Sequence, residues 1–269
     1  MAFNSYIQVQ DLVPVGEPVN GAARESSRPA QLSASSSEAI GPGYGVCWSS
    51  SAIPGRPLVI LPTSSAPFAG IVPLSAIPSD EEAAVLGETA DQVVPGKCFQ
   101  VGIPAASGAQ WRVPLPAGTS TVGAQAYLIY SGANAGKWAI SDLGVQPVYT
   151  LAVTSTGANT IGFYATIGGT AGVTLSVSSV SAAADAAALA ALWNASAEYR
   201  AYGTAAVGGT NDVVVTGNAY TAISFTDGSG GGNSIVPATT TALTAPTARA
   251  ISGATFAVAS STSTIVEIV

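Results

Sequence analysis

Acidic side chains are the residues of this chain whose spacing comes closest to a catalytic arrangement. Asp80, Glu81, Glu82 and Glu88 form the densest group, and glycoside hydrolysis needs only two carboxylates. The same group fits a solvated acidic patch or the acidic first turn of a short helix, which the composition of residues 75–92 favours. Carboxylate chemistry therefore stays open as an alternative, while the expectation is that the protein is not an enzyme.

Other catalytic arrangements lack the residues that they need. The chain has no histidine, which is the usual proton shuttle and the commonest metal ligand. It has no Gly-x-Ser-x-Gly motif, and neither Lys97 nor Lys137 follows a serine by three positions. Cys47 and Cys98 have no further soft ligand for zinc. We expect no cofactor and no metal, and we interpret the cysteines as buried or idle thiols while leaving a disulfide open.

The composition predicts a protein that acts by packing. Only 9% of the residues are charged, 48% are hydrophobic and the net charge is −7, so we expect no nucleic-acid partner, because that affinity comes from cations on phosphates. The strongest apolar stretch, residues 182–193, contains Asp185 and is shorter than the roughly 20 residues of a spanning helix. The first ten residues do not resemble a signal peptide, and we expect no membrane partner. So few charges favour a permanent homo-oligomer.

The first half, residues 1–145, is expected to be a small β-barrel or sandwich behind an extended, proline-rich arm at residues 1–40. Its apolar runs are brief and are bounded by Gly, Pro, Ser or Asn, which is typical of short strands joined by turns. Prolines within or beside these runs indicate edges and bulges. Tryptophan and tyrosine at alternating strand positions are interpreted as core residues.

The second half, residues 146–269, is expected to be an α+β module of antiparallel strands with one helix around 182–195. Ser181 can cap this helix, and Ala186, Leu189, Ala190 and Trp193 share one face. The string Gly-Gly-Thr occurs at 168–170 and again at 208–210, each time between two alternating runs, which predicts two hairpins. The tail, residues 248–269, offers two more strands. The whole chain is therefore expected to be mainly β.

Several short segments follow one another in a consistent order over about the first 140 residues. These segments are residues 12–21 (LVPVGEPVNG), 24–30 (RESSRPA), 40–48 (IGPGYGVCW), 68–72 (FAGIV), 93–101 (VVPGKCFQV), 111–113 (WRV), 122–127 (VGAQAY) and 136–138 (GKW). In the order of these segments, the first half resembles the structural cement, or capsid decoration, proteins of tailed bacteriophages. The second half is similar to add-on modules of phage tail and surface proteins.

This resemblance implies a virion protein on the outer capsid surface, made in the host cytoplasm. It would assemble as a homotrimer and bridge neighbouring major capsid proteins. Within the arm, residues 1–30 are expected to make the capsid contact, with apolar anchors and arginine forks. The candidate contact residues are Phe3, Tyr6, Ile7, Arg24 and Arg28. A tail or fibre subunit and a carbohydrate-binding adhesin remain alternatives.

Overall fold

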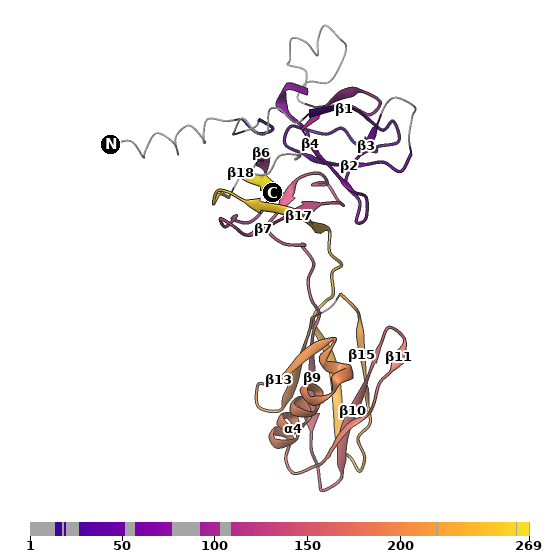
Figure 1. Ribbon diagram of the computed structural model, residues 1–269. Helices are drawn as coiled ribbons and strands as arrows, with labels where there is room; N and C mark the ends of the chain where they lie inside the picture. Colours follow the sequence, from indigo (N-terminus) through magenta and orange to yellow (C-terminus); the bar gives the residue numbers. More distant parts are fainter. Residues whose placement is uncertain are drawn as a thin grey trace, which may run out of the picture. The chain divides into compact units, whose positions relative to one another are not determined.

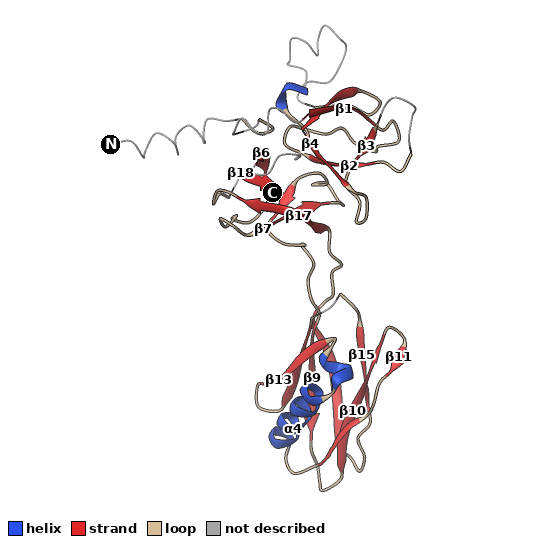
Figure 2. Ribbon diagram, in the orientation of Figure 1, coloured by secondary structure: helices blue, strands red, loops and turns tan. Residues whose placement is uncertain are grey.

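The computed structural model describes residues 14–17, 19, 27–51, 57–76, 92–102, 109–218, 220–261 and 263–268. It divides into two compact units. The first contains residues Met1–Leu143 and Thr247–Val269, and the second contains Gly144–Pro246. The protein is mainly β, as the sequence predicts (Figure 2). The second unit is thus an insertion between two strands of the first.

A closed barrel of five short strands forms one part of the first unit, in the order β1-β3-β2-β4-β5 (Figure 1). β1 pairs antiparallel with β5 and parallel with β3. A Cβ added to Gly70 would lie 2.2 Å from the carbonyl oxygen of Gly102, so glycine permits β4 and β5 to approach closely. The strands are β1 (Ser27–Leu32), β2 (Gly45–Trp48), β3 (Leu58–Ile60), β4 (Phe68–Ile71) and β5 (Cys98–Gly102), and the 3-10 helix η1 (Leu74–Ala76) follows β4.

The predicted arm of residues 1–40 overlaps the barrel. The part from residue 27 onward belongs to the folded body, because β1 completes the barrel between β3 and β5. Ala30, Leu32 and Ile40 are buried in the barrel core, and Ile40 forms a backbone bridge with Val93. The expectation of an arm was therefore wrong for residues 27–40. Proline and serine in this stretch indicate an extended backbone, and a short barrel strand has an extended backbone, just as a free arm does.

A five-stranded antiparallel sheet completes the first unit, in the order β6-β18-β17-β7-β8. Its two last strands in sequence lie in the middle, where β18 pairs with both β6 and β17 (Figure 1). Trp111, Trp138 and Phe256 are buried in its core. The strands are β6 (Ala109–Pro114), β7 (Gln125–Ile129), β8 (Trp138–Ala139), β17 (Ala248–Phe256) and β18 (Ser263–Ile268).

This sheet corrects the predicted domain boundary. The second module was expected to span residues 146–269, and the second unit does begin close to this point, at Gly144, but it ends at Pro246. Residues 247–269 return to the first unit because β17 and β18 supply the strands between β6 and β7. The chain runs into and out of the insertion along adjacent segments, where Val145 and Thr244 exchange two backbone hydrogen bonds of 3.0 Å.

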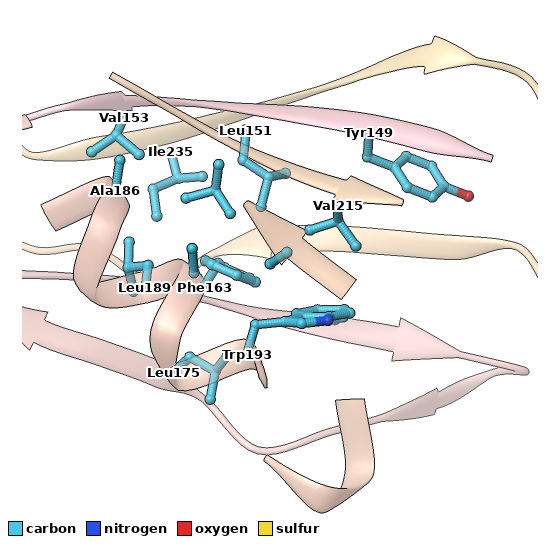
Figure 3. Close-up of a cluster of buried hydrophobic side chains, with 14 of the residues drawn as sticks. Tyr149, Leu151, Val153, Phe163, Leu175, Ala186, Leu189, Trp193, Val215 and Ile235 are labelled. Carbon is cyan, nitrogen blue, oxygen red and sulfur yellow. The ribbon is translucent and has the colours of Figure 1, made fainter. Parts of the chain in front are cut away.

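The second unit encloses one apolar core between two antiparallel sheets and a helix (Figures 1 and 3). One sheet has the order β13-β14-β9-β16, and in the other β10 pairs with β11, β12 and β15. The strands are β9 (Val148–Thr154), β10 (Thr160–Ile167), β11 (Thr170–Ala171), β12 (Leu175–Ser178), β13 (Gly203–Gly208), β14 (Asp212–Gly217), β15 (Ile223–Asp227) and β16 (Ser234–Thr241); the helices are α4 (Ala182–Ala195) and α5 (Ala197–Arg200).

Helix α4 confirms the predicted helix and its buried face. Ser181 is the N-cap, and its hydroxyl accepts a hydrogen bond from the backbone N–H of Ala184. The expected face is buried: Ala186, Leu189, Ala190 and Trp193. Trp193 stacks on Tyr199, with ring centroids 4.6 Å apart. Most of the stability of this alanine-rich helix therefore comes from the core that it covers.

Both predicted Gly-Gly-Thr hairpins are present. Gly168 and Gly169 have φ angles of +58° and +85° between β10 and β11, which is the tight turn that needs a positive φ at both central residues. Gly209, at φ +54°, lies in the turn between β13 and β14. Glycine is used at these positions for its conformational freedom.

Candidate functional site

Four of the five predicted contact residues, Phe3, Tyr6, Ile7 and Arg24, lie outside the described residues. Arg28 is described and is exposed on β1, where it is paired in register with Val101 of β5. The acidic group at residues 80–82 and 88 also lies outside the described residues, as does most of the predicted acidic segment. The structure therefore places one predicted contact residue on an exposed side of the barrel wall and does not test the others.

The described residues that lead into the arm are attached to the edge of the five-stranded sheet. The backbone N–H of Gly16 donates to Arg112 O at 2.8 Å, that of Val19 donates to Gln110 O at 2.8 Å, and that of Arg112 donates to Glu17 O at 3.1 Å. The segment thus runs antiparallel beside β6, as a further strand would. Sequence reasoning missed this attachment, although the glycine between Val15 and Glu17 is a signal of a close backbone approach.

Gly16 is the point at which this segment is fixed. Its φ is +88°, and an added Cβ would lie 2.7 Å from Pro42 Cβ and 2.9 Å from the backbone nitrogens of Gly43 and Leu74. Its carbonyl oxygen also accepts a hydrogen bond of 3.0 Å from the N–H of Leu74. Only glycine meets both the conformation and the space at this position. The backbone is therefore held in one conformation at Gly16.

The barrel and the five-stranded sheet share buried contacts within the first unit. The indole N–H of Trp138 donates to Gly43 O at 3.1 Å, and Trp138 makes an edge-to-face contact with Phe68, with centroids 5.9 Å apart. Arg249 Nη2 on β17 donates to Cys47 Sγ at 3.2 Å and also to Ala66 O. These contacts make one folded body of the two β layers.

The cysteines do not form a disulfide, which answers the question that the sequence left open. Cys47 is buried and Cys98 is exposed. Burial raises the pKa of the Cys47 thiol above its ordinary value, while the charge and the hydrogen bond of Arg249 act in the opposite direction. Cys47 is thus held as a neutral thiol beside a cation and is unsuited to be a nucleophile at neutral pH.

Charge is scarce in the second unit. Its charged side chains are Asp185, Glu198, Arg200, Asp212 and Asp227. Asp185 is buried, and it accepts hydrogen bonds from the Ser179 hydroxyl at 2.7 Å and from the Val180 N–H at 3.0 Å. The polar residues that alternate outward on β9 are Thr150 and Thr154, and both carry hydroxyls. The unit therefore presents surfaces that are almost uncharged, with exposed valines such as Val173, Val180 and Val236 among the polar residues.

Two absences concern the described part of the chain. No group of three or more His, Cys, Asp or Glu side chains in it could hold a metal ion. Within the same residues, no helix has both the length and the apolar character that crossing a bilayer requires.

Two comparisons with known sequences found no relative of this chain. The chain matches no protein-family model and no curated protein sequence.

Proposed function

We propose that this protein is a non-enzymatic virion component that decorates a tailed-phage capsid. In this proposal it binds to the outside of the capsid as a homotrimer, and it bridges neighbouring major capsid proteins. A ligand that binds only the assembled lattice stabilises that lattice by mass action. The resemblance of the first half to capsid cement proteins is the starting point of the proposal.

The observation that carries the proposal is the rigid attachment of the N-terminal segment. Gly16, Glu17 and Val19 form backbone hydrogen bonds with the edge of β6, and Gly16 fixes the direction of the chain. The preceding residues include Phe3, Tyr6 and Ile7, large side chains that suit the centre of a binding interface. A binding segment with one end already fixed loses less conformational entropy on binding than a free chain does.

The charge distribution supports binding on the outer side of a capsid. The net charge of −7 gives no electrostatic attraction to packaged DNA. The second unit interrupts the first unit between β8 and β17 without contributing a strand to it. An almost uncharged insertion of this kind suits a module that is exposed to solvent while the first unit holds the capsid.

The proposal is tested with full-length protein and purified capsids of the phage that encodes it. Co-sedimentation should show saturable binding, and replacing Phe3, Tyr6 and Ile7 together by alanine should weaken it by about tenfold or more. Arg28→Ala should weaken it less, because one exposed arginine contributes a peripheral contact. Arg200→Ala, in the second unit, is the matched control and should leave binding unchanged.

Three results would overturn the proposal. They are failure of the full-length protein to bind capsids, co-purification with tails after heads are removed, and a solution mass equal to the 26.5 kDa of one chain at the concentration used for binding. Co-purification with tails would favour the alternative of a tail or fibre subunit. Sedimentation equilibrium should instead give about three times the mass of the chain.

A further inference from the structure

An open groove lies on the first unit between three loops. Its volume is ≈ 410 Å³, and its walls are formed by residues 35–38 after β1, residues 60–63 at the end of β3, and residues 130–135 between β7 and β8. This volume falls in the range of small-ligand sites. A smaller cavity of ≈ 270 Å³ adjoins it and shares Ser131 and Gly132.

The groove is preformed, because backbone and side-chain hydrogen bonds fix each wall. In the first wall, the hydroxyls of Ser33 and Ser35 lie 2.8 Å apart and the Ser36 N–H donates to Ser33 O at 3.0 Å. In the second, the Thr63 hydroxyl accepts from the Ala66 N–H at 3.0 Å. The third is a turn in which the Ala135 N–H donates to Gly132 O at 3.0 Å. A ligand would therefore require little ordering of the protein.

The lining has a distinct chemical character. Hydroxyl groups come from all three walls, and the residues that supply them are Ser35, Ser36, Ser37, Thr63, Tyr130 and Ser131. Ile60, Leu61 and Pro62 add an apolar patch. Glu38 is the one charged residue of the lining, and no Lys or Arg belongs to it. An anionic ligand would meet a carboxylate and no cation in this groove, so its chemistry disfavours phosphate, sulfate and carboxylate ligands.

One polar atom of the wall has no partner within the described residues. The Ser36 hydroxyl is buried there without a hydrogen bond. Buried polar groups nearly always have partners, so an exception calls for an explanation. Because this oxygen is closed off from solvent, a ligand in the open groove would reach it only after the Ser36 side chain changed rotamer.

We propose that this groove binds a neutral saccharide. Sugar hydroxyls are donors and acceptors at once, as the serine, threonine and tyrosine hydroxyls of the walls are. The C–H faces of a sugar ring match the apolar patch at 60–62, and Glu38 can accept hydrogen bonds from two neighbouring hydroxyls. This inference goes beyond the capsid proposal and does not depend on it, since the groove belongs to the folded body of the first unit.

The test is a titration of the full-length, isotopically labelled protein with methyl glycosides of glucose, galactose and mannose and with N-acetylglucosamine. Amide resonances are followed up to about 50 mM sugar, which detects binding of only a few kcal/mol. At least one sugar should shift the amides of residues 35–38, 61, 63 and 131–135 in a saturable manner. Binding should be insensitive to salt because the ligand is uncharged.

Variants decide whether the groove is the site. Ser37→Trp and Ser131→Trp introduce an indole from two different walls, and both should reduce the sugar affinity at least tenfold. Ser37 lines only the larger groove, so its variant separates this groove from the adjoining cavity. Ser252→Trp places the same side chain at an exposed position on β17 and should leave binding unchanged. Thermal unfolding of all three shows which variants are folded.

Three outcomes would overturn the proposal. The first is the absence of saturable shifts with every sugar, and the second is shifts confined to the second unit. The third is that butylamine binds while the sugars cause no shift. If this amine binding weakens with salt and is abolished by Glu38→Gln, the groove is a cation site. Capsid binding is measured in a separate experiment. The absence of sugar binding would therefore not contradict the proposed function.

Discussion

The side-chain amide of Asn194 pairs with both backbone groups of Ala205. Its Nδ2 donates to the carbonyl oxygen of Ala205 at 2.8 Å, and its Oδ1 accepts from the N–H of Ala205 at 2.9 Å. Next to it, the indole N–H of Trp193 donates to Gly203 O at 3.0 Å. The end of α4 thus covers the outer edge of β13, in the place where a further strand would pair.

The opposite edge of this sheet is protected by a proline. The N–H of Val153 in β9 donates to Asn211 O, on the side of β14. Because backbone N–H and C=O groups point to alternate sides along a strand, those of Ala152 and Thr150 point toward β16. Pro237 lies opposite Leu151 in the register, and its nitrogen therefore faces outward. A residue without an N–H at the outer edge hinders the addition of another strand.

Replacing Asn194 by alanine should expose the edge of β13. We expect the free energy of unfolding to fall by about 1–3 kcal/mol, because two backbone groups lose their partners. We also expect concentration-dependent self-association through the open edge. Urea unfolding and light scattering measure the two effects. Asn211→Ala changes an exposed turn residue of the same unit and should show neither effect; equal behaviour of the two variants would show that Asn194 does not protect the edge.

Replacing Gly16 by alanine should detach the N-terminal segment from β6. The cost combines a left-handed backbone with contacts of 2.7 and 2.9 Å to neighbouring atoms, and we expect a loss of about 2 kcal/mol or more. Hydrogen exchange at Gly16, Val19 and Arg112 should accelerate. Gly96→Ala is the control, because Gly96 has the same φ of +88° and an added Cβ would meet nothing within 4 Å. If both variants lose the same stability, the packing around Gly16 contributes nothing.

Local signals were enough to predict the helix and strands of the second unit and the small barrel of the first, but not the sheet that completes the first unit. The alternation in β9 and β10, the cap at Ser181 and the face ending at Trp193 are all set by nearby residues, and each was predicted correctly. The return of β17 and β18 to the first unit depends on pairing across more than a hundred residues. A strand pattern does not show which sheet a strand joins, because every half-buried strand has the same period.

The groove and the attachment of residues 14–19 were missed for a related reason. Serines at 33–37 indicate a turn, but only the folded chain brings them near Thr63 and Tyr130. In the same way, the proline-rich start of the chain indicates extended backbone without naming β6 as its partner. Contacts between distant segments were therefore the part that the sequence alone could not predict.

Stability should decrease at alkaline pH because of Cys47. Burial raises the pKa of its thiol in the folded protein, so the unfolded chain loses this proton first, near the ordinary value of 9.0. The contribution is fully present below that pH and is lost as the pH rises toward the folded-state pKa. Urea unfolding between about pH 7 and pH 10 should show the fall. The raised pKa of Tyr199, caused first by burial, adds a similar fall at higher pH.

Cysteine variants separate this effect from general alkaline denaturation. Cys47→Ala should be less stable at neutral pH, because it leaves a small cavity and removes the partner of Arg249. Its stability should nevertheless depend less on pH near 9 than that of the unmodified protein. Cys98→Ala, at an exposed position, should keep the original dependence. An unchanged slope in the Cys47 variant would contradict the assignment.

Replacing Leu143 by asparagine should stabilise the point where the chain leaves the first unit. Leu143 is the one non-glycine residue in the described part of the chain with a positive φ, at 59°. Leucine is strained in this conformation, which asparagine tolerates, and at 37% exposure little apolar burial is lost by the change. We expect a gain of up to about 1 kcal/mol, seen as a higher Tm. Leu143→Gly should gain less, because glycine also increases the entropy of the unfolded chain. If the asparagine variant melts at a lower temperature than the unmodified protein, the contacts of the Leu143 side chain outweigh the strain of its backbone.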